Sequence, residues 1–158
     1  MLDLNSPSNR DLVHFFEKHS EWLGLGRYDG LVLAAIAINE FENSDMLSAD
    51  EIAEYTGYSR SNIGLILSQL ENLGVIAWHS DPSQRGRGRK KHLYRLSKGA
   101  NSIMRIGLKK VVDRMKDSIE EMRILMETYG NEMPHIKDML DEMTQDAEEA
   151  LSCVAKLS

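Results

Sequence analysis

Apolar residues recur every three or four positions through the first quarter of the chain, which predicts two helices. The first is expected over residues 8–24, with Ser8 or Asn9 as its N-cap. The second is expected over residues 27–43. Its stretch 31–38 is apolar on nearly all sides, so we expect this helix to be central and buried.

The next apolar stretches are shorter and are separated by a turn. Ser48 followed by Glu51 forms a capping-box pattern, which predicts the start of a short helix. Gly57 then supplies the positive φ that a tight turn needs, and Ser59 caps a second helix expected over residues 60–73. Two helices joined by a turn of three or four residues that contains glycine are typical of a helix-turn-helix.

Two short strand-like stretches follow directly and predict a β-hairpin. Strands are expected over residues 75–79 and 91–96, with a polar loop that contains glycine between them. A helix-turn-helix followed by a β-hairpin is a winged helix, so this hairpin is the predicted wing. The expected fold class is therefore mainly α with a small β-hairpin.

The last third of the chain predicts two further helices. A long helix is expected from about Ala100 to Tyr129, and Pro134 suits the first turn of the final helix. The apolar residues of the final helix step alternately by four and three, and they are Ile136, Leu140, Met143, Ala147, Ala150, Val154 and Leu157. These two helices could fold back as a hairpin within one chain or associate with a second copy. We favour dimerisation through them together with the first helix.

Charge is distributed unevenly along the chain. The 158 residues carry 25 acidic and 19 basic side chains, for a net charge of −6. Yet residues 85–91 hold five lysines and arginines within seven positions. Acidic segments repel nucleic acid and a basic loop attracts it, so the predicted wing is the expected point of contact.

Several classes of function find no support in the sequence. Cys153 is the single cysteine, so no internal disulfide is possible, and the five histidines lack the spacing of metal ligands. Neither a glycine-rich phosphate loop nor the sequence motifs of zinc proteases and serine hydrolases are present. We therefore expect no enzyme activity, no cofactor and no metal. The absence of a signal peptide and of a long apolar run leads us to expect a cytoplasmic protein.

The second helix of the helix-turn-helix has an outer surface suited to DNA. None of its residues is negatively charged and all but Leu65 are short, polar or basic: Ser59, Arg60, Ser61, Asn62, Leu65, Ser68 and Gln69. Arg60 can pair with guanine, and Asn62 or Gln69 with adenine, when such a helix enters the major groove. The alternative is an ordinary solvated surface on which Ser59 serves only as a cap.

The predicted wing adds a second set of DNA contacts. Its cations are Arg85, Arg87, Arg89, Lys90 and Lys91. Gly86 and Gly88 keep the tip slim, so the arginines can follow the backbone or enter a minor groove, while the lysines suit phosphates. The alternative is a solvated loop with no partner.

The sequence resembles the DNA-binding core of MarR-type winged-helix regulators over residues 46–100. The similarity is clearest in "SRSNIGLILSQLENLGVI" (residues 59–76) and in "LYRLSKGA" at the end of the wing. The GbsR and PadR branches fit equally well. The resemblance implies a homodimer that binds pseudo-palindromic operators and often responds to a small ligand. It also implies that Asp81 steadies an arginine in the minor groove, with Arg85, Arg87 and Arg89 all candidates.

Aromatic residues in the first two helices provide a candidate effector pocket. They are Phe15, Phe16, Trp22 and Tyr28. Family layout would place such residues near a pocket between the dimer helices and the winged helix, and an aromatic cage could take a cation. Ordinary core packing is the alternative interpretation.

These observations together predict three parts: N-terminal helices over residues 1–45, a winged helix-turn-helix over 46–99 and a helical hairpin for dimerisation over 100–158. The expected function is that of a sequence-specific, double-stranded-DNA-binding transcription regulator, a ligand-responsive repressor that acts as a homodimer. The alternatives are a winged helix that binds another protein or one that binds RNA. The cationic wing favours DNA over a protein partner.

Overall fold

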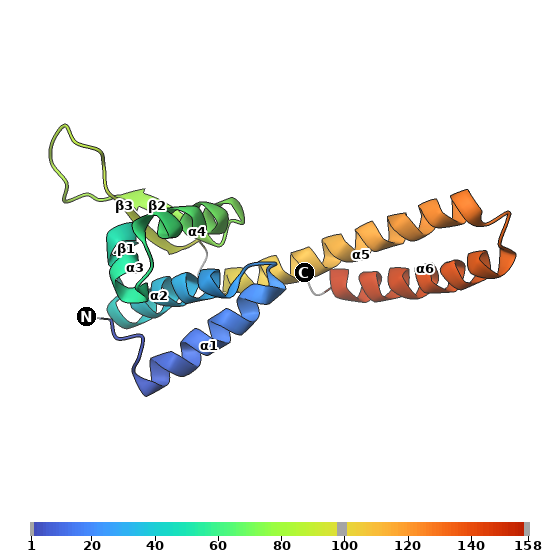
Figure 1. Ribbon diagram of the computed structural model, residues 1–158, viewed down its shortest axis with the longest axis horizontal. Helices are drawn as coiled ribbons and strands as arrows, with labels where there is room; N and C mark the ends of the chain where they lie inside the picture. The colour runs from blue at the N-terminus through green and yellow to red at the C-terminus, as the bar shows by residue number, and fades with distance from the viewer. Residues whose placement is uncertain (1, 98–100, 157–158) are drawn as a thin grey trace. The chain divides into compact units, whose positions relative to one another are not determined.

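The computed structural model describes residues 2–97 and 101–156 and divides into two compact units, Met1–Ile106 and Gly107–Ser158. The elements of the chain are, in order, α1 (Pro7–Trp22), α2 (Arg27–Asn43), β1 (Leu47–Ser48), α3 (Ala49–Thr56), α4 (Arg60–Asn72), β2 (Ile76–Ser80), β3 (His92–Leu96), α5 (Asn101–Tyr129) and α6 (Pro134–Ala155) (Figure 1). The division between the units falls within α5. Ala100, where the sequence predicted that this helix begins, lies outside the described residues.

Helix α2 is the centre of the first unit, as its apolar sequence predicted. Its residues 32–39 are all buried, and its bounds agree with the predicted ones. Helix α1 packs closely against it at Gly30, where an added Cβ would lie only 2.5 Å from the Cα of Glu17. A larger residue at position 30 would therefore push the two helices apart.

The predicted start of α1 was wrong by about two residues. The N-cap is Ser6, whose hydroxyl accepts a hydrogen bond from the backbone N–H of Asn9, rather than Ser8 or Asn9. Pro7 occupies the first helical turn, where the missing N–H costs nothing. Asn9 is buried instead, and its side chain donates to the carbonyl oxygen of Asp3 at 2.9 Å.

The helix-turn-helix forms where the sequence predicted it. Gly57 ends α3 with φ at 74°, which a residue with a side chain rarely adopts, and Ser59 caps α4. The inner sides of the two helices meet in the core of the first unit through buried aliphatic residues, among them Ile52, Ile63 and Leu70. This packing fixes α4 with its other side exposed.

The capping box at the start of α3 is complete. The hydroxyl of Ser48 accepts from the backbone N–H of Glu51 at 3.3 Å, and a carboxylate oxygen of Glu51 accepts from the backbone N–H of Ser48 at 2.8 Å. Burial raises the pKa of Glu51, but the hydrogen bonds from Ser48 outweigh this effect and hold the pKa below its usual value. The ionised carboxylate is therefore the form that stabilises the fold.

Replacing Glu51 with glutamine is expected to lower the free energy of unfolding by about 0.5 kcal/mol at neutral pH, because the amide oxygen still accepts from the backbone N–H of Ser48 but the hydrogen bond loses its charge. Because the pKa of Glu51 is lower in the folded state, its stabilisation is fully present above the unfolded pKa of roughly 4.3. It is lost as the pH falls through the folded pKa. Urea unfolding of both proteins between pH 7 and pH 3 measures this, and a difference that does not shrink in acid would contradict the assignment.

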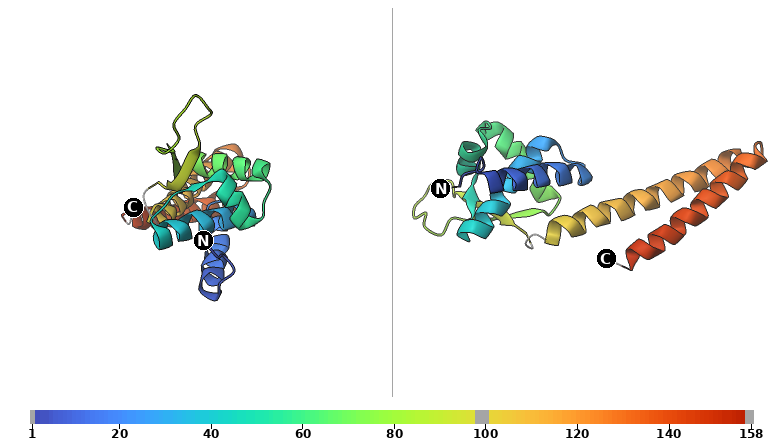
Figure 2. Two further views of the ribbon diagram at one scale, coloured as in Figure 1. Left: turned by 90° about the vertical axis from the view of Figure 1, so that its left-hand side faces the viewer. Right: turned by 90° about the horizontal axis from the view of Figure 1, so that it is seen from below.

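The sheet has three strands in the order β1-β3-β2, all antiparallel. The two hairpin strands begin one residue later than predicted, and β1 was not predicted at all. Strand β3 is fastened to α2 by Glu40, whose carboxylate accepts from the backbone N–H of Leu96 and from the guanidinium of Arg95, each at 2.9 Å. The wing therefore extends from a strand held on both edges and at its end (Figure 2).

In the second unit, α6 runs back alongside α5, as an intrachain hairpin (Figures 1 and 2). Ile119 and Leu140 are buried between the helices, and Arg123 pairs with Glu148 across them. Within a single chain, the side of α6 that faces α5 departs from the predicted four-three seam at Met143 and Ala150. Both are exposed, and Thr144 and Leu151 are less exposed than they are.

The side of α6 that faces α5 departs from the strict repeat because a straight α-helix has 3.6 residues per turn. Residues spaced by an average of 3.5 positions therefore move gradually away from that side along the helix. Leu157, the last predicted seam residue, lies outside the described residues.

Within residues 2–97 and 101–156, no helix is long and apolar enough to cross a membrane.

Candidate nucleic-acid interface

Helix α4 turns its predicted DNA-contacting side to solvent. All seven residues proposed from the sequence are exposed, and they are Ser59, Arg60, Ser61, Asn62, Leu65, Ser68 and Gln69. The hydroxyl of Ser59 accepts from the backbone N–H of Asn62 at 3.2 Å, so Ser59 is the cap of the helix as well as part of this surface. The remaining N–H groups of the first turn favour an anion such as a phosphate.

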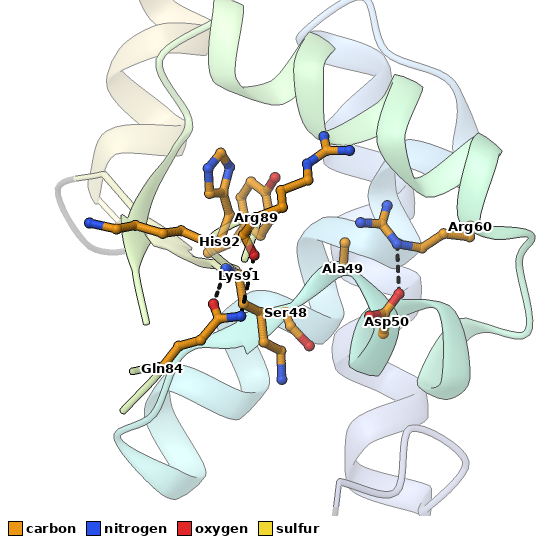
Figure 3. A pocket seen from close by; sticks show the side chains of 10 residues that line it. Ser48, Ala49, Asp50, Arg60, Gln84, Arg89, Lys91 and His92 are labelled. Carbon is orange, nitrogen blue, oxygen red and sulfur yellow. Dashed lines mark hydrogen bonds and ion pairs between the residues drawn. The ribbon is translucent and has the colours of Figure 1, made fainter. Parts of the chain in front are cut away.

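Arg60 has a partner that the sequence did not predict. Its Nε donates to Oδ1 of Asp50, near the start of α3, at 2.7 Å (Figure 3). A Cβ added at Gly64 would lie 3.9 Å from Nη1 of Arg60. The guanidinium therefore extends along α4 toward its C-terminal end, to the level of a residue one turn after Arg60. Asp50 of the neighbouring helix α3 thus holds the side chain of Arg60.

The base of the wing is closed by hydrogen bonds. The backbone N–H of Asp81 donates to the carbonyl oxygen of Lys91 at 3.0 Å. Gln84 then bridges the loop, since its Oε1 accepts from the backbone N–H of Lys91 at 2.6 Å and its Nε2 donates to the carbonyl oxygen of Arg89 at 3.2 Å. Sequence reasoning overlooked Gln84, because an isolated glutamine in a polar loop carries no pattern.

Asp81 makes local contacts in the DNA-free protein. Its Oδ1 accepts from the hydroxyl and the backbone N–H of Ser83 at 2.6 and 2.9 Å, and these bonds hold the pKa of Asp81 below its usual value. Within the described part of the chain, its hydrogen bonds do not involve an arginine side chain. The supporting role that the resemblance implies for Asp81 therefore belongs to the DNA complex, as a prediction.

The wing cations are all exposed: Arg85, Arg87, Arg89, Lys90 and Lys91. Gly86 has φ at 140°, a backbone conformation that suits glycine, and marks the narrow tip of the loop. Gln84 fixes the backbone of residues 89–91, so Arg85 and Arg87 lie in the part of the loop beyond this bridge. The wing thus combines a braced base with an open cationic tip.

A polar hollow of about 390 Å³ joins the wing to the helix-turn-helix. Arg60 and Asp50 line one side and Arg89 and Lys91 the other (Figure 3). Burial and the charge of Glu71 raise the pKa of the Tyr94 hydroxyl, and the charges of Arg60 and Arg89 oppose this rise. With Lys90, these residues place four cations around a concave surface, which is an arrangement that attracts phosphate.

Two acidic residues near this hollow, Asp50 and Glu51, lie in the first turn of α3. Asp50 pairs with Arg60 of α4, and Glu51 lies 3.9 Å from the ammonium of Lys91 in the wing. Helix α4 and the wing are therefore each tied to the first turn of α3. Within the described residues, no group of three or more His, Cys, Asp or Glu could hold a metal ion.

The four predicted pocket aromatics do not share one cavity. Phe15 and Phe16 line an apolar hollow of about 300 Å³ with Phe41 of α2. Tyr28 lines a different one of about 450 Å³, where its ring meets that of Tyr58 edge-on at 5.5 Å. Trp22 is exposed, 6.0 Å from His19 between ring centroids. The hollow lined by Tyr28 and Tyr58 is also lined by Asn62 and Leu65 of α4.

Neither a family model nor a curated protein matches this sequence. Solved structures do match it. A crystal structure of a transcriptional regulator matches 95% of this chain and 99% of its own, with 18% identity and a TM-score of 0.54. The chain has a winged-helix fold.

Two further solved structures resemble the winged-helix chain less closely. An S. aureus MepR mutant bound to an oligodeoxyribonucleotide is 13% identical, with 86% of this chain and 92% of that chain covered and a TM-score of 0.47. A MarR family transcription regulator is 14% identical, with coverage of 90% and 89% and a TM-score of 0.40. At these identities the likeness concerns the fold alone.

Proposed function

We propose that this winged-helix protein is a sequence-specific, double-stranded-DNA-binding transcription regulator that acts as a homodimer. The observation that carries the proposal is the shared hollow, because Arg60 of α4 and the wing cations Arg89, Lys90 and Lys91 line the same concave surface. A duplex that reached α4 through its major groove would bring its backbone to Arg89, Lys90 and Lys91. The fold, shared with a transcriptional regulator, supports the regulatory role.

The proposed contacts divide into two kinds. Arg60 and either Asn62 or Gln69 would read bases, because arginine matches guanine and the two amides match adenine. The wing residues would bind phosphates or enter the minor groove, which sets affinity and orientation rather than sequence preference. The net charge of −6 makes the wing the attractive part of an otherwise repulsive molecule.

A homodimer would place two recognition helices on successive half-sites, about 34 Å apart along the duplex. Exposed apolar residues on the second unit support this, since Ile124, Met139 and Met143 are each about half exposed to solvent. A small ligand would act by shifting the population of dimers whose recognition helices match that spacing. A repressor that a ligand releases from DNA is the finer form of this proposal.

Selection of genomic fragments by the purified protein is expected to yield a common, nearly palindromic site. Titrations of that duplex between 50 and 200 mM salt should show log K falling steeply with log salt, with a slope on the order of −5 to −10, because each phosphate contact releases condensed counterions. The matched controls are a scrambled duplex and an RNA duplex of the same sequence. Equal affinity for all three would contradict the proposal, and preference for RNA would favour the RNA-binding alternative.

A further inference from the structure

The contact between Arg60 and Asp50 joins the recognition helix to the preceding helix through one specific atom. Asp50 accepts from Nε of Arg60, which lies on the inner edge of the guanidinium. Guanine is read by two parallel hydrogen bonds from one side of such a group. We infer that Asp50 is a positioning residue for sequence discrimination, which holds Arg60 by Nε and leaves its Nη edge to read a base. The inference rests on the proposed function.

Stability does not account for this contact. The side chains of Arg60 and Asp50 are 57% and 78% exposed, and exposed ion pairs contribute little to folding because water and salt screen them. The two residues are ten positions apart on different helices, so their pairing is not a by-product of helical spacing. What the contact does is restrict a long, flexible side chain to one orientation.

The surface of α4 leaves room for that orientation. Gly64 lies one turn after Arg60, and a Cβ there would lie 3.9 Å from Nη1. Glycine weakens the middle of a helix, so its presence in α4 has a cost in stability. A long side chain at position 64 would compete with the guanidinium for this space. Arg60 is thus held from one side by Asp50 and lies over an open part of the helix on the other.

The charge of Asp50 points to discrimination rather than affinity. It lies in the hollow whose other charged residues are Arg60, Arg89, Lys90 and Lys91, and a carboxylate there repels every DNA phosphate. Asp50 therefore weakens binding to any sequence through its charge, and it strengthens binding to the correct one through Arg60. The result is a larger ratio between specific and non-specific affinity.

The test compares Asp50→Ala with Glu54→Ala, in the full chain. Glu54 is exposed on the same helix one turn further along, and the two substitutions remove the same charge. The measured quantity is the ratio of Kd for a scrambled duplex to Kd for the selected duplex. Asp50→Ala is expected to lower this ratio about tenfold, the discrimination that a good arginine–guanine contact provides. Glu54→Ala should change it by less than about twofold.

The same two substitutions in an Arg60→Ala background separate positioning from charge. If Asp50 acts through Arg60, Asp50→Ala should not alter the ratio of the two Kd values in the Arg60→Ala background. In the wild-type background, Asp50→Asn should lower the ratio less than Asp50→Ala does, because the amide oxygen still accepts from Nε of Arg60. An unchanged ratio for Asp50→Ala, or an equal loss without Arg60, would overturn the inference while leaving the proposed function intact. A wild-type protein that does not distinguish the two duplexes would overturn both.

Discussion

Replacing Arg85, Arg87 and Arg89 together with alanine is expected to weaken binding to the selected duplex by about a hundredfold or more near 0.1 M salt. Each guanidinium that leaves a phosphate removes one release of counterions, so the slope of log K against log salt should become less steep by about 0.9 for each phosphate that is no longer neutralised. The three side chains are exposed and the wing is closed through Gln84 and backbone atoms, so folding should be unaffected. Titrations at four salt concentrations measure both quantities.

The matched control removes three exposed cations from elsewhere, with Arg10→Ala, Lys18→Ala and Lys116→Ala combined. It changes the net charge by the same amount but leaves the wing intact, so its slope should stay close to that of the wild type. Should both triple variants lose affinity equally, general charge rather than the wing would bind DNA. Single arginine variants then show which of the three enters the minor groove, since that one should alter preference for narrow, A·T-rich sites.

Local sequence signals predicted most of the winged helix-turn-helix. The Ser48–Glu51 box, Gly57 and the Ser59 cap each act over three or four residues, so the helix-turn-helix could be located from the sequence. The wing was located because its charge and glycines stand out between two short apolar stretches. Helix α2 had the clearest signal, since a helix that is apolar on all sides has to be buried.

The features that the sequence did not predict depend on residues distant in the chain or on single polar side chains. Strand β1 has two residues, and it is a strand only because Leu47 and Ser48 pair with Tyr94 and Leu93 of β3. The contact of Asp50 with Arg60 depends on the angle that the turn sets between α3 and α4. The bridge from Gln84 depends on the closed loop. No periodicity in the sequence encodes any of these contacts.

The first turn of α3 illustrates how one local signal acquires a second role in the fold. The capping box was predicted as a helix start, and the structure also places Glu51 near Lys91 and Asp50 against Arg60. Helix α4 and the wing therefore share a single support. A substitution in this turn acts on both, which is why the predictions for Glu51 and Asp50 are measured by different quantities: unfolding for the first and sequence discrimination for the second.

Replacing Met139 and Met143 together with aspartate is expected to convert a dimer into a monomer and to weaken operator binding by about a hundredfold or more. The two side chains lie one turn apart on α6. They are 52% and 50% exposed, so folding of a single chain buries only about half of each. A second copy would cover them, and two charges in an apolar interface carry a large desolvation cost. The loss of DNA affinity follows because a monomer binds one half-site without the effective concentration that its partner supplies.

Sedimentation of the purified protein at micromolar concentration measures the first effect, and operator titration the second. The control is Gln145→Asp combined with Ser152→Asp, which adds the same charge at exposed polar positions of α6 and should leave the dimer intact. Thermal unfolding of the methionine variant should stay close to that of the wild type, since the inner face with Ile119 and Leu140 is untouched. A wild-type monomer, or a dimer that survives both aspartates, would mean that the exposed methionines of α6 do not form the interface.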